Sequence, residues 1–277
     1  MSSFDISISI DIDSTYQLQN DINILEEWAN QWMLKFHPDK CHVLTLGKFE
    51  NTMYTKRYQI SGQEMEHVFD EKDLGVIFDS NMSFDQHIAR KVNKANSMMG
   101  LIRRSFSYLD CKTFIKLYCA FVRPHLEYAQ SVWAPHLKRN IDIIEGVQIR
   151  ATKQVDGLSN MTYEECLRKL NLPTMAYRRL RGDLIEVYKH LNSYDTELLP
   201  ASFQRRLRPS RKHQRQLYDR IPKDGACGVQ SNSFYYRVPK VWNDLPNYVV
   251  QSQTLNSFKN QLDHHFSSIM FNDISIH

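Results

Sequence analysis

Residues 84–106, FDQHIARKVNKANSMMGLIRRSF, decide the kind of fold that this chain can adopt. Their apolar side chains recur every three or four positions, which is the period of an amphipathic helix beginning near Asn81. The side chains off this period include five cations. The segment therefore predicts a helix with one buried face and a basic outer face. The buried stripe is Phe84, Ile88, Val92, Ala95, Met99 and Ile102, and the cations are Arg90, Lys91, Lys94, Arg103 and Arg104.

Two more helices are expected directly downstream. The first runs from about Asp110 toward Pro124, where the missing amide hydrogen of proline should kink or end it. The second runs from near Asn140 to about Val155 and stops near Gly157. Three helices in succession suggest a small helical bundle.

The rest of the chain beyond this bundle is also expected to be mostly helical. Thr162 and Glu165 form a capping box, and Pro173 can serve as the first residue of a long helix through Leu191. Residues 201–229 interrupt the pattern with prolines and glycines, and predict a basic linker or loop. A closing helix has the inward residues Leu255, Phe258, Leu262 and Phe266.

The N-terminal part predicts short strands and one helix. Residues 1–13 alternate apolar and polar side chains, which is typical of a strand with one buried face. Further strands are expected at 43–47 and 72–79, with a hairpin around Gly62 and Gln63 between them. A helix should start at Ser14 and turn inward Leu18, Ile22, Leu25, Ala29 and Trp32.

The composition is that of a soluble globular chain. The mean hydropathy is −0.50 and no apolar run is long enough to cross a membrane. No secretory leader is present, so the protein is expected to be cytoplasmic or nuclear and not secreted. The five cysteines form no CxxC pair, which argues against both a disulfide framework and a zinc knuckle.

Charge is distributed unevenly along the chain. The formal net charge is +4, but residues 1–30 hold six acids and no Lys or Arg, which leaves +10 for residues 31–277. A basic excess of this kind favours a nucleic-acid partner, because cations that contact phosphates release counterions. The competing interpretation is that the excess serves only solubility.

Two groups of residues could suggest a metal site, and both are weak. Asp11 and Asp13 precede a helix start, where carboxylates are favoured by the helix dipole and by capping. His37, Cys41 and His42 have the right ligand types, but they are too few for a cytosolic metal enzyme. No metal site and no small-molecule ligand are predicted from these residues.

Six segments, in this order, resemble the reverse transcriptases of jockey-like non-LTR retrotransposons, and the resemblance covers roughly residues 15–270. No single segment is specific, but six in register over this length are. They are LQNDINILEEWANQWMLKFHPDKC (18–41), EKDLGVIFDSNMSFDQHI (71–88), KANSMMGLIRRSF (94–106), VRPHLEYAQSVWAPHL (122–137), IEGVQIRATK (144–153) and LNLPTMAYRRLRGDLIEVYK (170–189).

The resemblance implies an RNA-directed DNA polymerase whose two adjacent aspartates, in an FADD box, bind two Mg²⁺ ions. Neither FADD nor YADD occurs in this sequence. The chain is therefore expected to correspond to the region downstream of that box, with no cofactor of its own. Mg²⁺ is expected for the full-length enzyme.

Some positions match the palm of this family. The segment FHPDKC resembles the palm turn after the catalytic box, which makes Lys40 a candidate proton donor to the leaving pyrophosphate. The family usually has asparagine where His37 stands. The segment KDLGV resembles the primer grip, with Leu74 and Gly75 at its centre, and a glycine allows close approach of the backbone to the primer. A solvated lysine and a glycine at a strand bulge are the alternative interpretations.

Other positions match the thumb and the helices beyond it. The resemblance implies phosphate contacts for Lys91, Lys94, Arg103 and Arg104, which would recognise the shape and charge of the duplex and not its sequence. Two further clusters, YRRLRGD and RRLRPSRKHQR, are electrostatic candidates or solvated charge runs. The segment VRPHLEYAQSVWAP is expected to fill the core with Tyr128 and Trp133, and the alternative is a base-stacking platform. The candidate arginines of the two clusters are Arg178, Arg179, Arg181, Arg205, Arg206 and Arg208.

The expected fold is a helix-rich α+β chain: a partial palm with a few antiparallel strands, then a helical thumb bundle and additional helices. The expected organisation is a palm remnant with a primer-grip-like hairpin (1–79), a thumb-like bundle (80–160), a helical extension (161–200), a basic linker (201–229) and a small C-terminal helical segment (230–277). In isolation, residues 1–79 should expose apolar surface and be poorly ordered or prone to aggregation.

The expected function is that of a reverse transcriptase fragment that retains the grip on an RNA template and a DNA primer, without polymerase activity alone. The alternative is a non-catalytic nucleic-acid-binding or scaffold protein derived from such an element. The two differ in whether fingers and the remainder of a palm are encoded upstream in the same frame. No membrane partner is expected.

Overall fold

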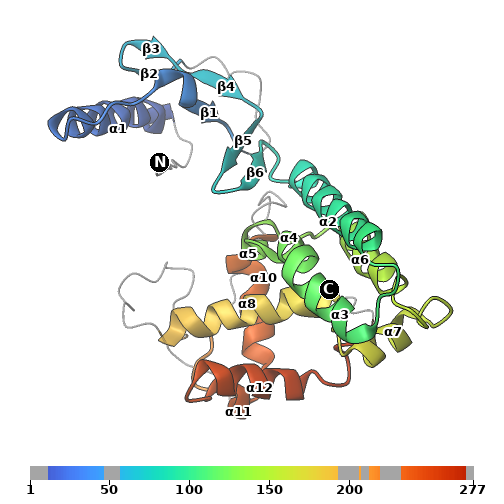
Figure 1. The fold of residues 1–277 in the computed structure, drawn as a ribbon. Coiled ribbons are helices and arrows are strands. Elements are labelled where there is room, and N and C mark those ends of the chain that lie inside the picture. Colours follow the sequence, from blue (N-terminus) through green and yellow to red (C-terminus); the bar gives the residue numbers. More distant parts are fainter. Residues whose placement is uncertain (1–11, 47–56, 193–205, 207–211, 219–231, 273–277) are drawn as a thin grey trace. The chain divides into compact units, whose positions relative to one another are not determined.

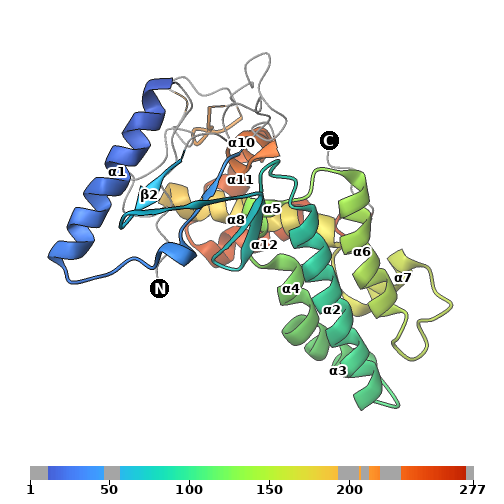
Figure 2. The same ribbon diagram turned by 90° about the horizontal axis from the view of Figure 1, so that it is seen from above.

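The computed structural model describes residues 12–46, 57–192, 206, 212–218 and 232–272 (Figures 1 and 2). Contacts within the chain define two compact units, residues 1–86 and 87–277. The first unit combines a long helix with short strands, and the described parts of the second are almost entirely helical. The predicted helix-rich α+β class is confirmed.

The described part of the first unit contains a helix, a 3-10 turn and three pairs of short strands. Two pairs are antiparallel, as expected, but β1 and β4 are parallel. Of the strand expected over residues 1–13, residues 1–11 lie outside the described part, and Ile12 and Asp13 belong to the helix. The elements are α1 (Ile12–Gln31), η1 (Pro38–Lys40), β1 (His42–Leu44) with β4 (Glu66–Val68), β2 (Gln59–Ile60) with β3 (Gln63–Glu64), and β5 (Asp70–Asp73) with β6 (Val76–Asp79).

Two tight turns shape the strands of this unit. Ser61 and Gly62 join β2 to β3 with φ angles of 51° and 73°, and Leu74 and Gly75 join β5 to β6 with φ angles of 43° and 83°. Positive φ at both central residues is what a two-residue type I′ hairpin requires. The segment 72–79, which was expected to be one strand, is therefore a hairpin that reverses direction at Leu74.

The first unit has a small core, in which α1 packs against the β2–β3 hairpin. Ile22 of α1, Tyr58, Ile60 and Met65 are buried together. Trp32 was expected on this buried face but is 64% exposed. The reason is that α1 ends at Gln31, so the helical period no longer applies at the next residue.

Asp79 organises the start of α2, which begins at Asp85 and not near Asn81. Its carboxylate accepts hydrogen bonds from the amides of Asn81 (3.1 Å), Ser83 (3.0 Å) and Phe84 (2.7 Å). Asp79 therefore holds residues 81–84 in a turn, because its carboxylate offers their amides an alternative to helical hydrogen bonds.

The second unit consists of helices connected mostly by short turns. The two bundle helices expected after α2 are both present, and the first of them continues through Pro124. The helices are α2 (Asp85–Ser105), α3 (Cys111–Leu117), η3 (Tyr118–Val122), α4 (Arg123–Glu127), α5 (Gln130–Trp133), α6 (Lys138–Thr152), α7 (Tyr163–Leu170), α8 (Met175–Asn192), α10 (Phe234–Asp244), α11 (Asn247–Val250) and α12 (Leu255–His265).

Pro124 changes the helix and does not end it. Residues 118–122 form a π-helical turn, η3, directly before α4. Proline cannot donate to a carbonyl four residues earlier, and the wider turn accommodates this loss. Two neighbouring residues of this turn differ strongly in burial: Val122 is fully buried and Phe121 is 55% exposed.

The start of α8 depends on a contact from α6. The Glu145 carboxylate accepts hydrogen bonds from the amides of Met175 (3.1 Å) and Ala176 (3.3 Å), and the Thr174 hydroxyl accepts one from Tyr177 (3.1 Å). A carboxylate at a helix N-terminus is favoured by the helix dipole. The helix therefore starts after Thr174, two residues later than the proline-based expectation. The predicted capping box of Thr162 and Glu165 at α7 is confirmed.

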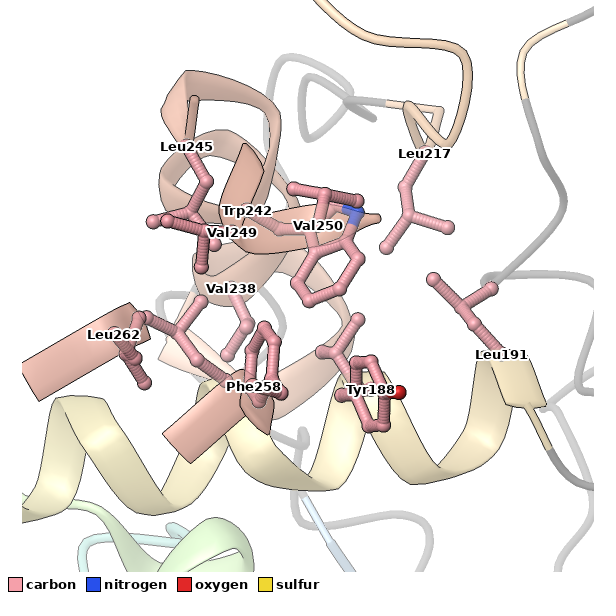
Figure 3. Close-up of a cluster of buried hydrophobic side chains, with 12 residues drawn as sticks. Tyr188, Leu191, Leu217, Val238, Trp242, Leu245, Val249, Val250, Phe258 and Leu262 are labelled. Carbon is pink, nitrogen blue, oxygen red and sulfur yellow. The ribbon is translucent and has the colours of Figure 1, made fainter. Parts of the chain in front are cut away.

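The second half of this unit has its own apolar core between α8, α10, α11 and α12 (Figure 3). The rings of Tyr188 and Phe258 stack with centroids 4.3 Å apart, and Trp242 lies against Phe258 at 5.9 Å. Phe258 and Leu262 are fully buried, which confirms the inward face predicted for the closing helix.

Part of the segment expected to be a basic linker lies in this core. Leu217 is fully buried, and His213 and Gln216 are buried beside it. The side chain of Asn243 of α10 forms two hydrogen bonds with the backbone of Leu217. It accepts from the Leu217 amide (2.8 Å) and donates to the Leu217 carbonyl (2.9 Å). The Trp242 indole also donates to the Arg215 carbonyl at 2.8 Å. Residues 212–218 are thus an integral strap of the C-terminal helices.

Candidate nucleic-acid interface

The candidate interface starts from α2, whose two faces differ as the sequence predicts. The whole predicted apolar stripe is buried, with no side chain more than 7% exposed. On the outer side, Lys94, Arg103 and Arg104 are exposed and Lys91 is half-buried. Within the described ranges, no carboxylate forms an ion pair with Lys94, Arg103 or Arg104. These three cations are therefore available to an external anion.

The region around α2 is almost free of acidic residues. Residues 86–126 contain eight Lys and Arg residues and a single acid, Asp110. The Asp110 carboxylate caps α3, where it accepts hydrogen bonds from the amides of Lys112 (2.8 Å) and Thr113 (3.1 Å). Bonds from the Thr113 side chain and amide lower the pKa of Asp110. The positive charge of this region is consequently little neutralised by its own segment.

Two side chains adjoin the lysines of α2: His125 of α4 and Tyr128, which directly follows α4. The Lys91 ammonium lies 5.0 Å from the centroid of the Tyr128 ring, a cation–π distance. Burial lowers the pKa of His125 below its ordinary value, and the nearby charges of Lys94 and Lys91 lower it further. Phe121 precedes His125 by four residues and is exposed. This exposed face was not the favoured expectation, because the aromatic and proline-rich sequence of the segment favoured the core over base stacking.

Tyr128 and Trp133 differ in burial, although both were expected to fill the core. Trp133 is 1% exposed, and its indole donates to the Tyr128 carbonyl at 2.7 Å. The Tyr128 side chain is 51% exposed, so the expectation for it was wrong. The reason is that α4 ends at Glu127, and Ala129 with φ of 53° reverses the chain so that only the tryptophan enters the core.

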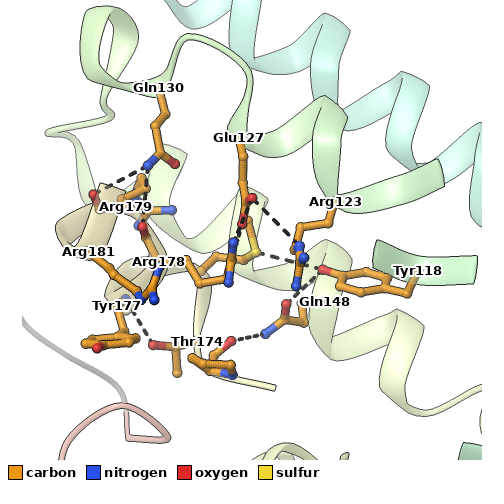
Figure 4. A network of polar contacts seen from close by, with 12 residues as sticks. Tyr118, Arg123, Glu127, Gln130, Gln148, Thr174, Tyr177, Arg178, Arg179 and Arg181 are labelled. Carbon is orange, nitrogen blue, oxygen red and sulfur yellow. Dashed lines mark hydrogen bonds and ion pairs between the residues drawn. The ribbon is translucent and has the colours of Figure 1, made fainter. Parts of the chain in front are cut away.

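The three candidate arginines of α8 are engaged within the protein (Figure 4). The Arg178 guanidinium donates through Nε and Nη2 to the two oxygens of the Glu127 carboxylate. The Arg181 guanidinium pairs with Asp263 of α12 at 2.6 and 2.9 Å. Arg179 is only 7% exposed. The cluster YRRLRGD therefore ties α8 to α4 and α12, a structural role that clustered charge alone does not reveal.

A buried polar chain beside these arginines connects three helices, η3, α6 and α7, and the turn before α8. The Tyr118 hydroxyl donates to Oε1 of the Gln148 side chain (2.8 Å). Nε2 of the same side chain donates to the Tyr163 hydroxyl (3.0 Å) and to the Pro173 backbone carbonyl (2.9 Å). The Tyr163 hydroxyl in turn donates to Glu145. Burial, followed by the Glu145 charge, raises the pKa of Tyr118 and of Tyr163, so both remain protonated donors. This network orients the helices behind the interface.

The second arginine cluster is only partly described. Arg205 and Arg208 lie outside the described residues. Arg206 donates from its amide to the Gln216 carbonyl (2.8 Å) and from its guanidinium to the Leu217 carbonyl (3.0 Å). Arg206 thus contacts the strap of residues 212–218.

Lys40, Leu74 and Gly75 belong to the first unit. Lys40 is exposed at the end of η1. Leu74 is 74% exposed at the tip of the β5–β6 hairpin. A side-chain contact joins the neighbouring strands, because His42 Nδ1 lies 2.6 Å from Glu71 Oε2, a hydrogen-bond distance. This contact links β1, directly after Lys40 and Cys41, to β5.

The described residues include no group of three or more His, Cys, Asp or Glu side chains placed to hold a metal ion. The side chains of the weak metal candidate have other contacts: His42 pairs with Glu71, and the Cys41 thiol contacts the His37 carbonyl at 3.5 Å. Separately, none of the described helices has the length and hydropathy needed to cross a membrane.

Three known proteins are similar in sequence to this chain. The chain is 25% identical over 225 residues to the RNA-directed DNA polymerase from mobile element jockey of Drosophila funebris, which covers 77% of this chain and 24% of that protein. It is 23% identical over 168 residues to the jockey polymerase of Drosophila melanogaster, covering 58% and 18%. It is 26% identical over 207 residues to the probable RNA-directed DNA polymerase from transposon BS of Drosophila melanogaster, covering 69% and 22%.

All three relatives carry the name of RNA-directed DNA polymerases of mobile elements, and their similarity to this chain is distant. The chain spans about a quarter or less of the length of the three polymerases. No protein-family model matches the sequence. No solved structure matches it either.

Proposed function

We propose that this chain is part of the RNA-directed DNA polymerase of a non-LTR mobile element, and that its second unit grips the nucleic acid. The observation that carries the proposal is the cationic face of α2 in a segment nearly without acids. Lys91, Lys94, Arg103 and Arg104 are its phosphate contacts. The names of the three relatives support the same assignment.

In this proposal, residues 80–160 form a thumb-like bundle that rests on a template–primer duplex. Cations on a helix contact phosphates without selecting a base sequence, which suits a polymerase that must copy any template. Residues 161–200 and 230–277 support the bundle, since Arg178 and Arg181 connect α8 to α4 and α12. Arg205, Arg206 and Arg208 remain secondary phosphate candidates.

Residues 1–79 are the proposed palm remnant. The β5–β6 turn at Leu74 and Gly75 is the candidate primer grip, because a tight turn with an exposed tip allows close approach of a DNA backbone. Lys40 is the candidate proton donor to the leaving pyrophosphate. The aspartate pair of the FADD box is absent from this sequence, so we expect no polymerase activity from this chain alone. Mg²⁺ belongs with that aspartate pair in the complete enzyme.

The test is a titration of a blunt RNA–DNA duplex with the full chain at several salt concentrations. Replacing Lys91, Lys94, Arg103 and Arg104 by alanine should make the slope of log K against log [salt] shallower by roughly 3 to 4, since each phosphate contact contributes about one unit. A charge-matched control replaces Lys138, Lys169, Lys189 and Lys240, which are exposed on other helices, and should keep the slope. Equal effects of both variants would contradict the interface.

A primer-extension assay with Mg²⁺ on the same protein addresses catalysis. We expect duplex binding without extension. Metal-dependent extension would show that another pair of carboxylates performs the role of the missing aspartates, and would overturn the assignment of this chain as a grip without catalysis.

A further inference from the structure

Exposed aromatic rings occur in the segment from η3 to the residue after α4, and this segment contacts the α2 lysines through His125 and Tyr128. Phe121 is 55% exposed and Tyr128 is 51% exposed. Phe121 lies in η3, His125 lies in α4 and Tyr128 directly follows α4, and none of the three side chains is buried. The Lys91 ammonium at 5.0 Å from the Tyr128 ring joins this aromatic row to the lysines. We call Phe121, His125 and Tyr128 the aromatic row.

Phe121 lies on the π-helical turn η3 and Tyr128 directly follows α4, and two large exposed rings in one segment require an explanation. Exposure of two rings of this size to water gives no hydrophobic stabilisation, and π-helical turns occur frequently at functional sites. The row adjoins a cationic helix, so its ligand should combine flat apolar faces with negative charge. Unpaired nucleotides have this combination, because every base has a π-face and every linkage has a phosphate. The bases of a duplex are stacked on one another and cannot offer their faces to a protein ring.

We propose that the aromatic row binds the unpaired strand that adjoins the duplex on α2, with Phe121 and Tyr128 stacking on bases and Lys91 and Lys94 holding the phosphates between them. This inference rests on the proposed function, because it assumes that α2 holds the duplex. It adds a second binding mode, in which the same lysines serve a single strand with exposed bases.

The charges around the row fit this role. The neighbouring acid, Glu127, is paired with Arg178 and lies near Arg123, so it does not oppose phosphates with an unpaired charge. The lowered pKa of His125 leaves its imidazole neutral at pH 7, and a neutral ring stacks without repelling Lys91 and Lys94. The Trp133 bond to the Tyr128 carbonyl holds the backbone under the ring and leaves the side chain outward.

The experiment measures fluorescence anisotropy of three labelled RNA–DNA duplexes with the full chain: one blunt, one with a single-stranded template overhang, and one with an abasic overhang of equal length. We expect the natural overhang to bind more tightly than the other two. Replacing Phe121 and Tyr128 together by alanine should remove this preference, by about tenfold for each ring, and leave the blunt duplex unchanged.

Two controls separate stacking from folding. The aromatic substitutions Phe121→Tyr and Tyr128→Trp should retain the preference, since they retain the rings. Tyr248→Ala removes a ring that is 49% exposed on α11 and should change nothing. Circular dichroism and thermal unfolding of each variant check that the helices are intact.

The possible outcomes distinguish the two proposals. Binding of the duplex without preference for the overhang, or a preference that survives the double alanine variant, would overturn the aromatic row and leave the α2 grip standing. If the double alanine variant lost equal affinity for the blunt and overhang duplexes, the rings would contact the duplex. This result would also overturn the proposal for the aromatic row. Absence of salt-dependent binding to any duplex would overturn the proposed function itself.

Discussion

His87 shows how one buried side chain makes stability depend on pH. It is 1% exposed, and its ring lies 5.2 Å from the ring of Trp133. Burial, reinforced by the charges of Lys91 and Arg90, lowers its pKa from 6.5 to about 4. The folded state therefore binds fewer protons than the unfolded state between these two values, and stability must fall as the pH drops through this window.

We expect the free energy of unfolding to fall by about 1–2 kcal/mol between pH 7 and pH 5 because of His87. Urea unfolding of the wild type and of His87→Gln at both pH values measures this contribution as the difference between the two pH dependences. The pKa values of His125, His213 and His265 are also lowered, but these residues are present in both proteins and cancel. Identical pH dependences would show that His87 titrates normally.

Burial of single side chains was predictable where a helix continued and failed where it ended. The stripe of α2 from Ile88 to Ile102 is buried as its period predicts, because each residue keeps its place on one helical face. Trp32 and Tyr128 each follow the last residue of a helix and are exposed. The local sequence did not show where α1 ends, so its period was extended one step too far, to Trp32. It also did not show where α4 ends, so Tyr128 was assigned to the core with the rest of its segment.

The strap of residues 212–218 is held to α10 mainly through Asn243. The Asn243→Ala substitution would leave the Leu217 amide and carbonyl without these partners in a buried setting. The Leu217 carbonyl keeps its hydrogen bond from the Arg206 guanidinium (3.0 Å), so only the amide is left unsatisfied. We expect a loss of about 2 kcal/mol, since one unsatisfied buried group costs about 1–3 kcal/mol. Chemical unfolding measures the loss, and hydrogen exchange of the Leu217 amide should become faster.

The matched control is Asn260→Ala on the exposed side of α12, which should change stability by no more than about 0.5 kcal/mol. A loss for Asn243→Ala no larger than that of the control would mean that the strap is not bound through this side chain. The basic composition of residues 205–220 suggested a solvated linker. Only the packing of Leu217 against Trp242 and Leu191 shows that this segment contributes to the core.

The two units differ in the size of their cores. The first unit buries four apolar residues around Ile22, whereas one core of the second unit alone buries twelve. The first unit also exposes large apolar side chains on and after α1, including Trp28 (41%), Trp32 (64%) and Met33 (92%). An apolar surface of this kind favours association, and a small core favours local opening.

We expect amides of α1 and the β2–β3 hairpin to exchange with deuterium faster than those of α2, α6 and α8 in the full chain. Mass spectrometry of peptides from each unit provides the measurement. Replacing Trp28 and Trp32 by glutamine should reduce aggregation without lowering the melting temperature, whereas Trp242→Gln should unfold the C-terminal core. Equal protection of both units would refute the difference in stability.

The helical class, the amphipathic faces and most helix positions follow from the sequence, because period, capping residues and prolines act within a few neighbours along the chain. The role of each charge does not. Arg178, Arg181 and Arg237 pair with Glu127, Asp263 and Asp183, which lie 51, 82 and 54 residues away. Whether an arginine faces solvent or a carboxylate depends on the path of the whole chain. The tertiary structure alone therefore distinguishes the cations of α2, which face outward, from those of α8, which hold the helices together.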